Sequence, residues 1–375
     1  MARCVILAVA GAGKTYHICH AIDSNKRNLI LTYTNENVRN IVRELKDVGH
    51  GEVPYLTDVM TFDSFVYRYA ICPFNPTIRA SFGDCKDTVI GGLTWEAPPP
   101  QMLGKGKNRR PNPFYQKNSK WRHYTTQSGK YYGERLCELV MSVGKRREKL
   151  INRVAAHVKL FYDFVAIDEF QDFRCHKFDF MLGLVRKLDD VILVGDYYQH
   201  SVSGRTNYGK PFDDTTYDGF IKKLERFGFQ VDVSTLSISR RCADQVCAVV
   251  RDSLGILIYG KPDVVAAVIR VTDRFEAESL FRDKAVPKLL WDKDFLLPVM
   301  ANTISWGRSK GDTYEDACLV LTDSTNVIMQ RDGKYSKSDT VKNKLYVALT
   351  RAKRNVYLVD HEIFCAIKAD SKNEK

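Results

Sequence analysis

A glycine-rich segment near the start of the chain has the residue types and spacing of a phosphate-binding loop. It spans Ala8–Thr15 (AVAGAGKT) and overlaps the end of residues 4–9, a short apolar run typical of a buried parallel strand. The usual pattern is GxxxxGK[ST], and this chain has Ala8 at the first position. A helical pattern follows the loop, which completes the expected order of strand, loop and helix.

Each residue type in this loop has a chemical task. Gly11 and Gly13 allow backbone N–H groups to curl around a β-phosphate, while Lys14 supplies positive charge to the β- and γ-phosphates. Thr15 offers its hydroxyl to Mg²⁺. The residues expected to bind the nucleotide are Ala10, Gly11, Ala12, Gly13, Lys14 and Thr15.

A second apolar run, residues 161–167, ends in Asp168 and Glu169. Two acids at the end of a strand are the expected companion of a phosphate loop, because the reaction needs both a metal ligand and a base. We expect Asp168 to hold Mg²⁺ and Glu169 to accept a proton from the attacking water and orient it. The alternative is an acidic helix N-terminus favoured by the helix dipole.

A third apolar run, residues 191–194, leads into the sequence GDYYQ, which ends at Gln199. Parallel strands place their carboxyl ends at one edge of a sheet, so a Gln that follows such a strand is positioned to sense the γ-phosphate. Taken alone, Gln199 is equally an ordinary loop residue.

Positive charge is concentrated in one part of the chain. Lys and Arg total 57 against 45 acids, a formal net charge of +12. Residues 101–150 contain 13 of these cations and only three acids, and aromatic residues are interleaved with them. Cations neutralise phosphates and aromatic faces stack on unpaired bases, so the mixture favours a nucleic-acid surface. The interleaved aromatics are Phe114, Tyr115, Trp121, Tyr124, Tyr131 and Tyr132.

The alternative for this segment is a solvated loop with a few aromatics in a small core. Several prolines argue against regular structure over about 91–120, and a helical pattern resumes near Tyr132. The basic region is therefore expected to be an insertion between two better-ordered blocks.

Other protein classes are excluded or disfavoured by composition. The 44% apolar and 27% charged content is that of a globular chain. No apolar run reaches the roughly 18 residues of a membrane span. The first residues imitate a signal peptide, but they continue into the phosphate loop, and we expect a cytoplasmic protein. The ten cysteines form no CxxC pair, which favours free thiols over zinc ligands.

The order of these segments resembles the superfamily 1 helicases of the UvrD/Rep/PcrA type. The resemblance extends from about residue 4 to about residue 360. The matching segments are Ala8–Thr15, Leu31–Asn35 (LTYTN), Thr61–Phe65 (TFDSF), Asp168–Asp172 (DEFQD), Gly195–Gln199 (GDYYQ), Ser239–Arg241 (SRR), Ser309–Tyr314 (SKGDTY) and Tyr346–Lys353 (YVALTRAK).

The resemblance adds functional residues that the chemistry of the loop alone does not indicate. It implies that Arg241 and Arg351 are arginine fingers that contact the γ-phosphate, although without the other motifs surface salt bridges would explain them. It adds Gly311 of the SKG element to the nucleotide-binding residues. The residues implied to hold a single strand are Thr32, Thr34, Asn35, Thr61 and Phe62.

The resemblance also implies a fold and a domain organisation. We expect an α/β protein with two RecA-like P-loop domains built on parallel sheets, plus a small basic insertion in the first. The first domain is expected at 1–70 and 156–210, the insertion at 71–155, and the second domain at 211–375. ATP and Mg²⁺ are the implied cofactors.

The chain departs from the family pattern at several points. Asp63 stands where the family usually has His, and Thr313 stands where a ribose-contacting Glu is usual. Residues 1–7 contain no Gln, so we expect the nucleotide to bind without the Gln-containing adenine-binding motif of the family. The stretch between Arg241 and Ser309 is too short for the large extra domain of well-known members, which is associated with unwinding of duplexes.

Two functions of different classes follow. The first is an ATP-dependent translocase or helicase that moves on a single strand, with DNA and 3′-to-5′ movement implied by the resemblance and duplex held by residues 101–150. The second is an ATP-gated regulatory subunit of a nuclease or defence complex, with a nuclease as protein partner and little unwinding of its own. A small-molecule kinase is weaker, because it gives the YVALTRAK segment and the basic insertion no role.

Overall fold

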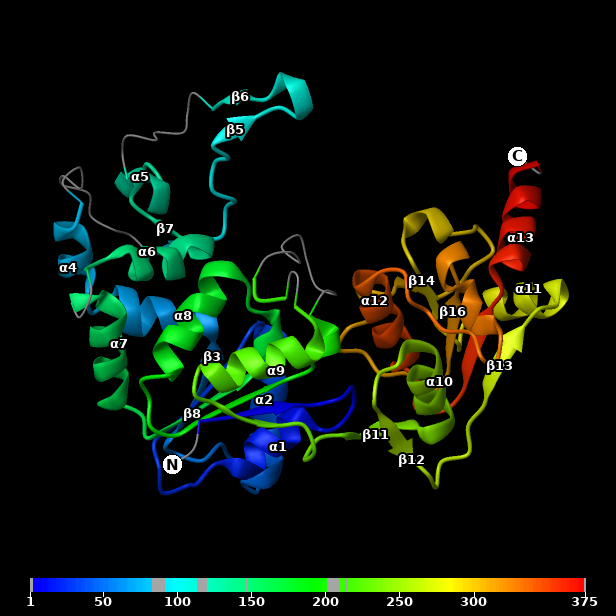
Figure 1. Ribbon diagram of the computed structural model, residues 1–375, viewed down its shortest axis with the longest axis horizontal. Coiled ribbons are helices and arrows are strands. Elements are labelled where there is room, and N and C mark those ends of the chain that lie inside the picture. Colours follow the sequence, from blue (N-terminus) through cyan, green and yellow to red (C-terminus); the bar gives the residue numbers. More distant parts are fainter. Residues whose placement is uncertain are drawn as a thin grey trace. The chain divides into compact units, whose positions relative to one another are not determined.

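The computed structural model describes residues 3–82, 92–112, 120–145, 148–200, 210–212 and 215–373 (Figure 1). Within these ranges no helix is both long enough and apolar enough to cross a membrane.

Strands and helices follow one another along most of the chain. The strands are β1 Arg3–Leu7, β2 Asn28–Thr32, β3 Thr57–Thr61, β4 Leu93–Thr94, β5 Met102–Leu103, β6 Arg110–Pro111, β7 Tyr131–Tyr132, β8 Phe164–Asp168, β9 Val191–Gly195, β10 Gln230–Asp232, β11 Ile238–Ala243, β12 Tyr259–Lys261, β13 Val268–Val271, β14 Lys288–Leu290, β15 Thr303–Ser305, β16 Ala317–Val320 and β17 Val356–Val359. The α-helices are α1 Lys14–Ala21, α2 Asn35–Val48, α3 Phe62–Phe65, α4 Asn75–Ala80, α5 Lys120–Tyr124, α6 Leu136–Ser142, α7 Leu150–Lys159, α8 Cys175–Val185, α9 Tyr217–Arg226, α10 Asp244–Leu254, α11 Arg274–Arg282, α12 Asp339–Leu349 and α13 His361–Asn373.

Short helical segments join several of these elements. The π-helical segment is η1 Val66–Ile71, and the 3₁₀ segments are η2 Gly106–Asn108, η3 Gly133–Arg135, η5 Phe170–Asp172, η6 Tyr197–Gln199, η7 Lys293–Phe295 and η8 Asp323–Met329.

Two larger sheets and three small ones contain the strands. The strand order is β10-β1-β9-β8-β2-β3 in the six-stranded sheet and β13-β17-β16-β14-β15 in the five-stranded sheet. All neighbouring pairs of the five-stranded sheet are parallel. In the six-stranded sheet β2 pairs in parallel with both β3 and β8. Non-consecutive neighbours joined by helical crossovers are the arrangement of α/β proteins.

The chain forms two compact units. Unit 1 comprises residues 1–4, 18–193 and 222–230, and unit 2 comprises residues 5–17, 194–221 and 231–375.

Unit 1 places the ends of three parallel strands side by side. Thr32 at the end of β2 is level with Thr61 at the end of β3, and Leu31 is level with Ile167 of β8. Every residue of β2 and β8 is buried, as expected for strands covered on both faces. The strand ends are where open α/β sheets bind their ligands.

The first part of the insertion carries small sheets that suit its proline-rich sequence. Strands β5 and β6 pair antiparallel and are joined through η2, which forms a hairpin (Figure 1). Strand β4 pairs with β7.

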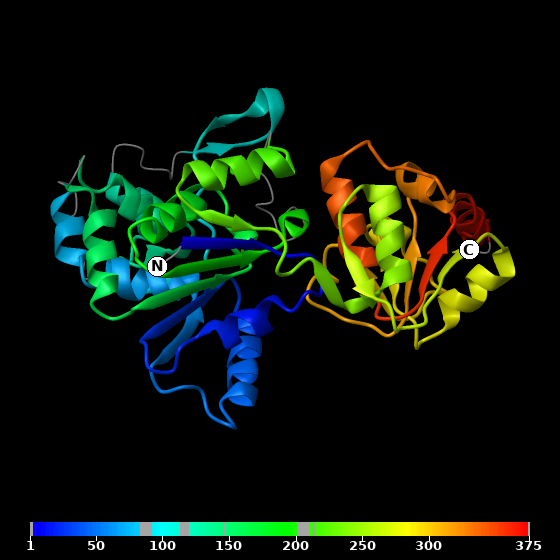
Figure 2. The same cartoon turned by 60° about the horizontal axis from the view of Figure 1, so that its bottom comes forward.

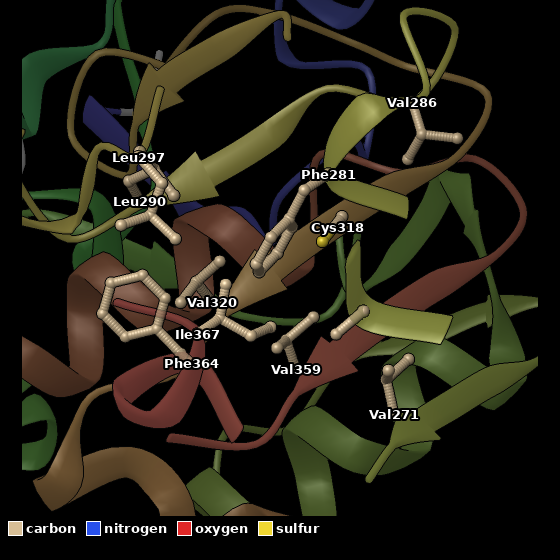
Figure 3. Packing of buried hydrophobic residues seen from close by; sticks show 11 residues of the cluster. Val271, Phe281, Val286, Leu290, Leu297, Cys318, Val320, Val359, Phe364 and Ile367 are labelled. Atoms are coloured by element: carbon tan, nitrogen blue, oxygen red, sulfur yellow. The ribbon is translucent and has the colours of Figure 1, made fainter. Parts of the chain in front are cut away.

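Unit 2 is a three-layered α/β structure around the five-stranded sheet. Helices α10 and α12 lie on one face of this sheet, and α11 and α13 lie on the other (Figure 2). Alternate residues of the strands, such as Cys318 and Val320 of β16, point toward α11 and α13 and pack with Phe281 and Phe364 (Figure 3). Every second residue of the strand therefore packs against the apolar faces of two helices.

The predicted fold class is confirmed: the chain is α/β, and parallel sheets form its framework.

Replacement of Phe281 by Ala tests the packing of unit 2. Phe281 is wholly buried in the cluster, so the variant is expected to lose about 3–5 kcal/mol of unfolding free energy, measured by denaturant titration. Phe275→Ala on the same helix is the control, because that ring is 81% exposed and its loss should cost within about 0.5 kcal/mol. Equal losses in both variants would contradict this packing.

Candidate nucleotide and strand sites

The phosphate loop has the backbone conformation that its glycines predict. Gly11 has φ of +73° and Gly13 has φ of +88°, a region in which residues with a Cβ are strained. Helix α1 begins directly afterwards, at Lys14. This alternation of backbone conformation turns successive N–H groups toward one side, and the helix N-terminus adds its positive dipole end. The loop therefore offers an anion site.

The loop is held by hydrogen bonds within unit 2. The N–H of Ala8 donates to the carbonyl of Gly195 over 2.8 Å, and the N–H of Arg240 donates to the carbonyl of Gly11 over 2.8 Å. The SRR segment of β11 is thereby fixed against the glycines of the loop.

Contact at Gly11 is too close for any side chain. A Cβ built there would lie 2.6 Å from Cβ of Arg241 and 2.8 Å from Oγ of Ser239. Glycine at this position allows Arg241 to lie directly against the loop.

The two predicted arginine fingers lie near each other. Nη1 of Arg241 donates to the carbonyl of Thr350 over 3.3 Å. Arg351, which is 2% exposed, donates through Nε to the carbonyl of Val347 over 2.9 Å and through Nη1 to the carbonyl of Asp312 over 3.3 Å. Part of the donor set of Arg351 is therefore occupied by backbone, and Arg241 is the more exposed of the two.

In the described part of the chain, neither Arg241 nor Arg351 has a carboxylate within 4.0 Å. Burial and then the nearby charge of Arg241 lower the pKa of Arg351 to about 10, so the Arg351 guanidinium keeps its proton at neutral pH. The two arginines are near enough for their charges to interact, and Arg241 contacts the loop through its Cβ.

Gln199 is buried and belongs to the 3₁₀ segment η6, so it does not lie in an exposed loop. Its Nε2 donates to Oδ2 of Asp196 over 2.8 Å, and Oδ1 of the same carboxylate accepts the N–H of Tyr198 over 3.0 Å. Asp196 thus fixes the side-chain amide of Gln199.

Gly311 lies on an exposed turn of unit 2 with φ of +97°. Thr313 beside it is also exposed, and Arg351 donates to the carbonyl of Asp312 between them. The SKG element and the YVALTRAK segment therefore touch through this arginine.

In unit 1 the two predicted acids lie at the end of β8. Asp168 is 2% exposed, and its Oδ1 accepts the N–H of Glu169 over 3.0 Å. Glu169 has φ of +54°, a left-handed conformation that non-glycine residues adopt at a cost of about 1 kcal/mol or more. Nε2 of Gln171 donates to its carboxylate. Because of this strained turn, the backbone at Glu169 does not continue in the direction of β8.

The predicted strand-binding residues differ in exposure. Thr34 and Asn35 are exposed at the start of α2, where the Thr34 hydroxyl caps the helix by accepting the N–H of Asn37 over 3.1 Å. Thr61 caps α3 in the same way and is half-buried.

Two of these residues are buried. Thr32 is 0% exposed, and Phe62 is 1% exposed and packs against Phe173 with ring centroids 4.5 Å apart. In this conformation neither residue offers surface to a nucleic-acid strand.

Asp63, which replaces the usual His, forms an ion pair with Lys177. Its Oδ2 accepts from Nζ of Lys177 over 2.7 Å, and both side chains are mostly buried. The same ammonium lies 5.4 Å from the ring centroid of Tyr33 in the LTYTN segment. The substitution thus brings a cation from α8 to the two strand-end motifs.

The basic insertion keeps its exposed charge but not its predicted stacking surface. The described aromatics that the sequence suggested for base stacking are at most 9% exposed and form a small core, so the stacking interpretation is wrong for them and the core alternative holds. These residues are Trp121, Tyr124, Tyr131 and Tyr132. Phe114, Tyr115, Lys117, Arg146 and Arg147 lie outside the described residues.

Exposed cations gather on the β5–β6 hairpin. Lys105, Lys107, Arg109 and Arg110 are all exposed, and no acid lies between them in the sequence. Trp95, which the sequence analysis did not single out, is 64% exposed and lies against Gly133, whose built Cβ would be 2.5 Å from the indole. The sequence shows that the insertion contains a tryptophan here, and the structure adds that its indole is exposed.

Fold and loop together define a P-loop α/β protein. A family model described as "AAA domain" matches residues 2–205, more than half of the chain. The chain belongs to this family, which is a P-loop family of the helicase type. A search of the curated proteins found no match.

Three solved structures of helicases are similar to this chain at low sequence identity. The structure of PRRSV helicase has 12% identity, covers 96% of this chain and 52% of its own chain, and has a TM-score of 0.43. A complex of arterivirus nonstructural protein 10 (helicase) with DNA has 15% identity, coverage of 95% and 60%, and a TM-score of 0.45. The crystal structure of arterivirus nonstructural protein 10 (helicase) has 13% identity, coverage of 96% and 59%, and a TM-score of 0.45. The chain thus spans between about half and three fifths of the length of these proteins.

Replacement of Gly11 by Ala tests the close approach of the loop to β11. The added Cβ would meet Arg241 and would also adopt a left-handed conformation, so it carries both a steric and a conformational cost. Gly255→Ala is the matched control, since φ there is +63° and nothing lies within 4 Å of the added Cβ. Gly11→Ala is expected to lose about 1–3 kcal/mol more unfolding free energy than Gly255→Ala. Similar losses would show that the loop and β11 do not touch.

Proposed function

We propose that this protein is an ATP-dependent motor on single-stranded nucleic acid, of the UvrD/Rep/PcrA helicase type. The observation that carries the proposal is the pair Arg241 and Arg351, two positively charged side chains near each other in unit 2, of which Arg241 packs through its Cβ against Gly11 of the phosphate loop. Charge of this kind stabilises the oxygens of a phosphoryl group during transfer.

The residues present fit ATP and Mg²⁺. The loop combines two left-handed glycines, a helix N-terminus and Lys14, which suits a triphosphate. Hydroxyl and carboxylate oxygens are the ligands that Mg²⁺ prefers, and the UvrD/Rep/PcrA resemblance assigns this role to Thr15 and Asp168. When bound, ATP supplies the phosphoryl group and Mg²⁺ neutralises charge on its oxygens.

The remaining steps of the reaction are assigned to side chains whose contacts the structure describes. Glu169 would take a proton from the attacking water, with its carboxylate oriented by the amide of Gln171. Gln199 would contact the γ-phosphate or the water, and Arg241 would stabilise the developing charge, supported by Arg351. Gly311 would line the nucleotide site on the SKG turn.

Single-stranded nucleic acid would lie across the motifs at the ends of β2 and β3 in unit 1. Thr34 and Asn35 offer exposed polar groups and Thr61 is half-buried, whereas Thr32 and Phe62 are buried and would hold the contacting residues in place. Nucleotide hydrolysis would alternate the affinity for the strand, which moves the chain along it. The choice of DNA and of 3′-to-5′ movement rests on the UvrD/Rep/PcrA resemblance.

The β5–β6 hairpin would hold duplex or displaced strand. Its four exposed cations would contact phosphates, which positions nucleic acid without selecting sequence.

Variants of the loop and of the base test the proposed reaction. Lys14→Ala should abolish phosphate release from MgATP in the presence of a single strand, because the triphosphate loses its cation. Glu169→Gln should lower kcat by about 10²–10⁴-fold while ATP still binds, because only the base is lost. Phosphate release and fluorescent-nucleotide binding measure the two effects. Exposed Lys46→Ala and Glu315→Gln serve as controls and should keep wild-type rates. Retention of most activity in either site variant would refute these roles.

Removal of the hairpin cations tests the nucleic-acid surface. A variant with Ala at Lys105, Lys107, Arg109 and Arg110 should bind a forked duplex more weakly, and the slope of log affinity against log salt should fall by about 3–4. Fluorescence anisotropy at several salt concentrations measures both quantities. The control replaces four exposed lysines of unit 2, namely Lys261, Lys284, Lys293 and Lys334. An unchanged salt slope in the hairpin variant would exclude this surface.

A further inference from the structure

Tyr346 lies at the centre of a buried hydrogen-bond chain. It belongs to α12 and is 0% exposed. Its hydroxyl accepts the N–H of Ala10 in the phosphate loop over 2.7 Å and donates to Oδ2 of Asp196 over 2.9 Å. One side chain thus connects the loop to the segment that carries Gln199, and all three belong to unit 2.

The direction of each hydrogen bond is fixed by chemistry. A backbone N–H can only donate, and an ionised carboxylate can only accept, so the Tyr346 hydroxyl must accept from Ala10 and donate to Asp196. The same Oδ2 atom of Asp196 also accepts the amide of Gln199 over 2.8 Å. A change in the Ala10 peptide would therefore be passed through one oxygen atom to the side-chain amide of Gln199.

Burial stabilises this chain of hydrogen bonds. Desolvation and then the charge of Asp196 raise the pKa of Tyr346 well above its ordinary value, so the hydroxyl keeps its proton at neutral pH. Asp196 is itself 0% exposed, and water cannot replace a lost partner without reorganisation of the site.

We propose that Tyr346 is a positioning residue that couples the phosphate loop to Gln199, so that Gln199 takes its working orientation when a γ-phosphate occupies the loop. The inference rests on the proposed nucleotide hydrolysis. The coupling acts on the chemical step and on the difference between triphosphate and diphosphate, and it leaves the binding contacts of Lys14 in place.

Tyr346→Phe in the full chain tests this coupling, since it removes only the hydroxyl. With MgATP and a saturating single-stranded oligonucleotide, kcat should fall at least about tenfold while KM changes less than about threefold. Tyr162→Phe is the matched control. Tyr162 is also buried, and its hydroxyl links Tyr69 over 2.5 Å and the carboxylate of Asp58 over 2.6 Å, within unit 1. The control should keep kcat within about twofold, and equal losses in both variants would overturn the inference.

A second readout distinguishes coupling from a structural role. Wild-type protein should gain more thermal stability from a non-hydrolysable ATP analogue than from ADP. Tyr346→Phe should lose that difference while it keeps the ADP shift. A preserved difference would overturn the inference.

A second variant tests the inference in case Tyr346→Phe does not fold. Asp196→Asn keeps the side-chain shape and should reproduce the kcat loss and the lost analogue-minus-ADP difference. Where both single variants fold, the double variant should lose no more kcat than the worse single one, because both act on one chain. Independent, multiplied losses would contradict it. Absence of any hydrolysis by wild-type protein would instead refute the proposed function, whereas normal hydrolysis with an unaffected Tyr346→Phe would refute only this inference.

Discussion

The positive charge shared by Arg241 and Arg351 constrains the rest of unit 2. Burial of the Arg351 guanidinium costs free energy, and the positive charge of Arg241 nearby raises that cost, while the charge of Asp196 lowers it. Carbonyl groups of the last turn of α12 offset part of it, because Val347 and Thr350 accept from these arginines at the negative end of the helix dipole. The positive charge that these carbonyl groups do not offset would attract a phosphate group.

Placement of that charge depends on the absence of a side chain at Gly11. The loop and β11 approach so closely that a single methyl group would collide with Arg241. Tyr346 adds a directional link from the loop to Asp196. The loop, Arg241, Tyr346, Asp196 and Gln199 are thus joined by direct contacts and hydrogen bonds within unit 2.

Sequence patterns predicted the residues at strand ends well and the interior of the site poorly. The loop glycines, Asp168 and Glu169 are recognisable because strand, turn and charge follow one another locally. The contact of Tyr346 with Ala10 joins residues 336 positions apart, and no local pattern indicates it. Burial reversed one interpretation: alternating cations and aromatics in the insertion suggested stacking, yet the described rings, such as Trp121, fill a small core. Aromatic side chains serve both purposes, and only the packing around them distinguishes the two.

Stimulation of hydrolysis by a strand tests the central claim most directly. The measurement is the rate of phosphate release by the wild-type chain at saturating MgATP, with and without a saturating single-stranded oligonucleotide. A motor whose nucleotide site and strand site are coupled should hydrolyse ATP at least about tenfold faster with the strand present. Equal rates in both conditions would contradict a nucleic-acid motor and leave a P-loop hydrolase that works on something else.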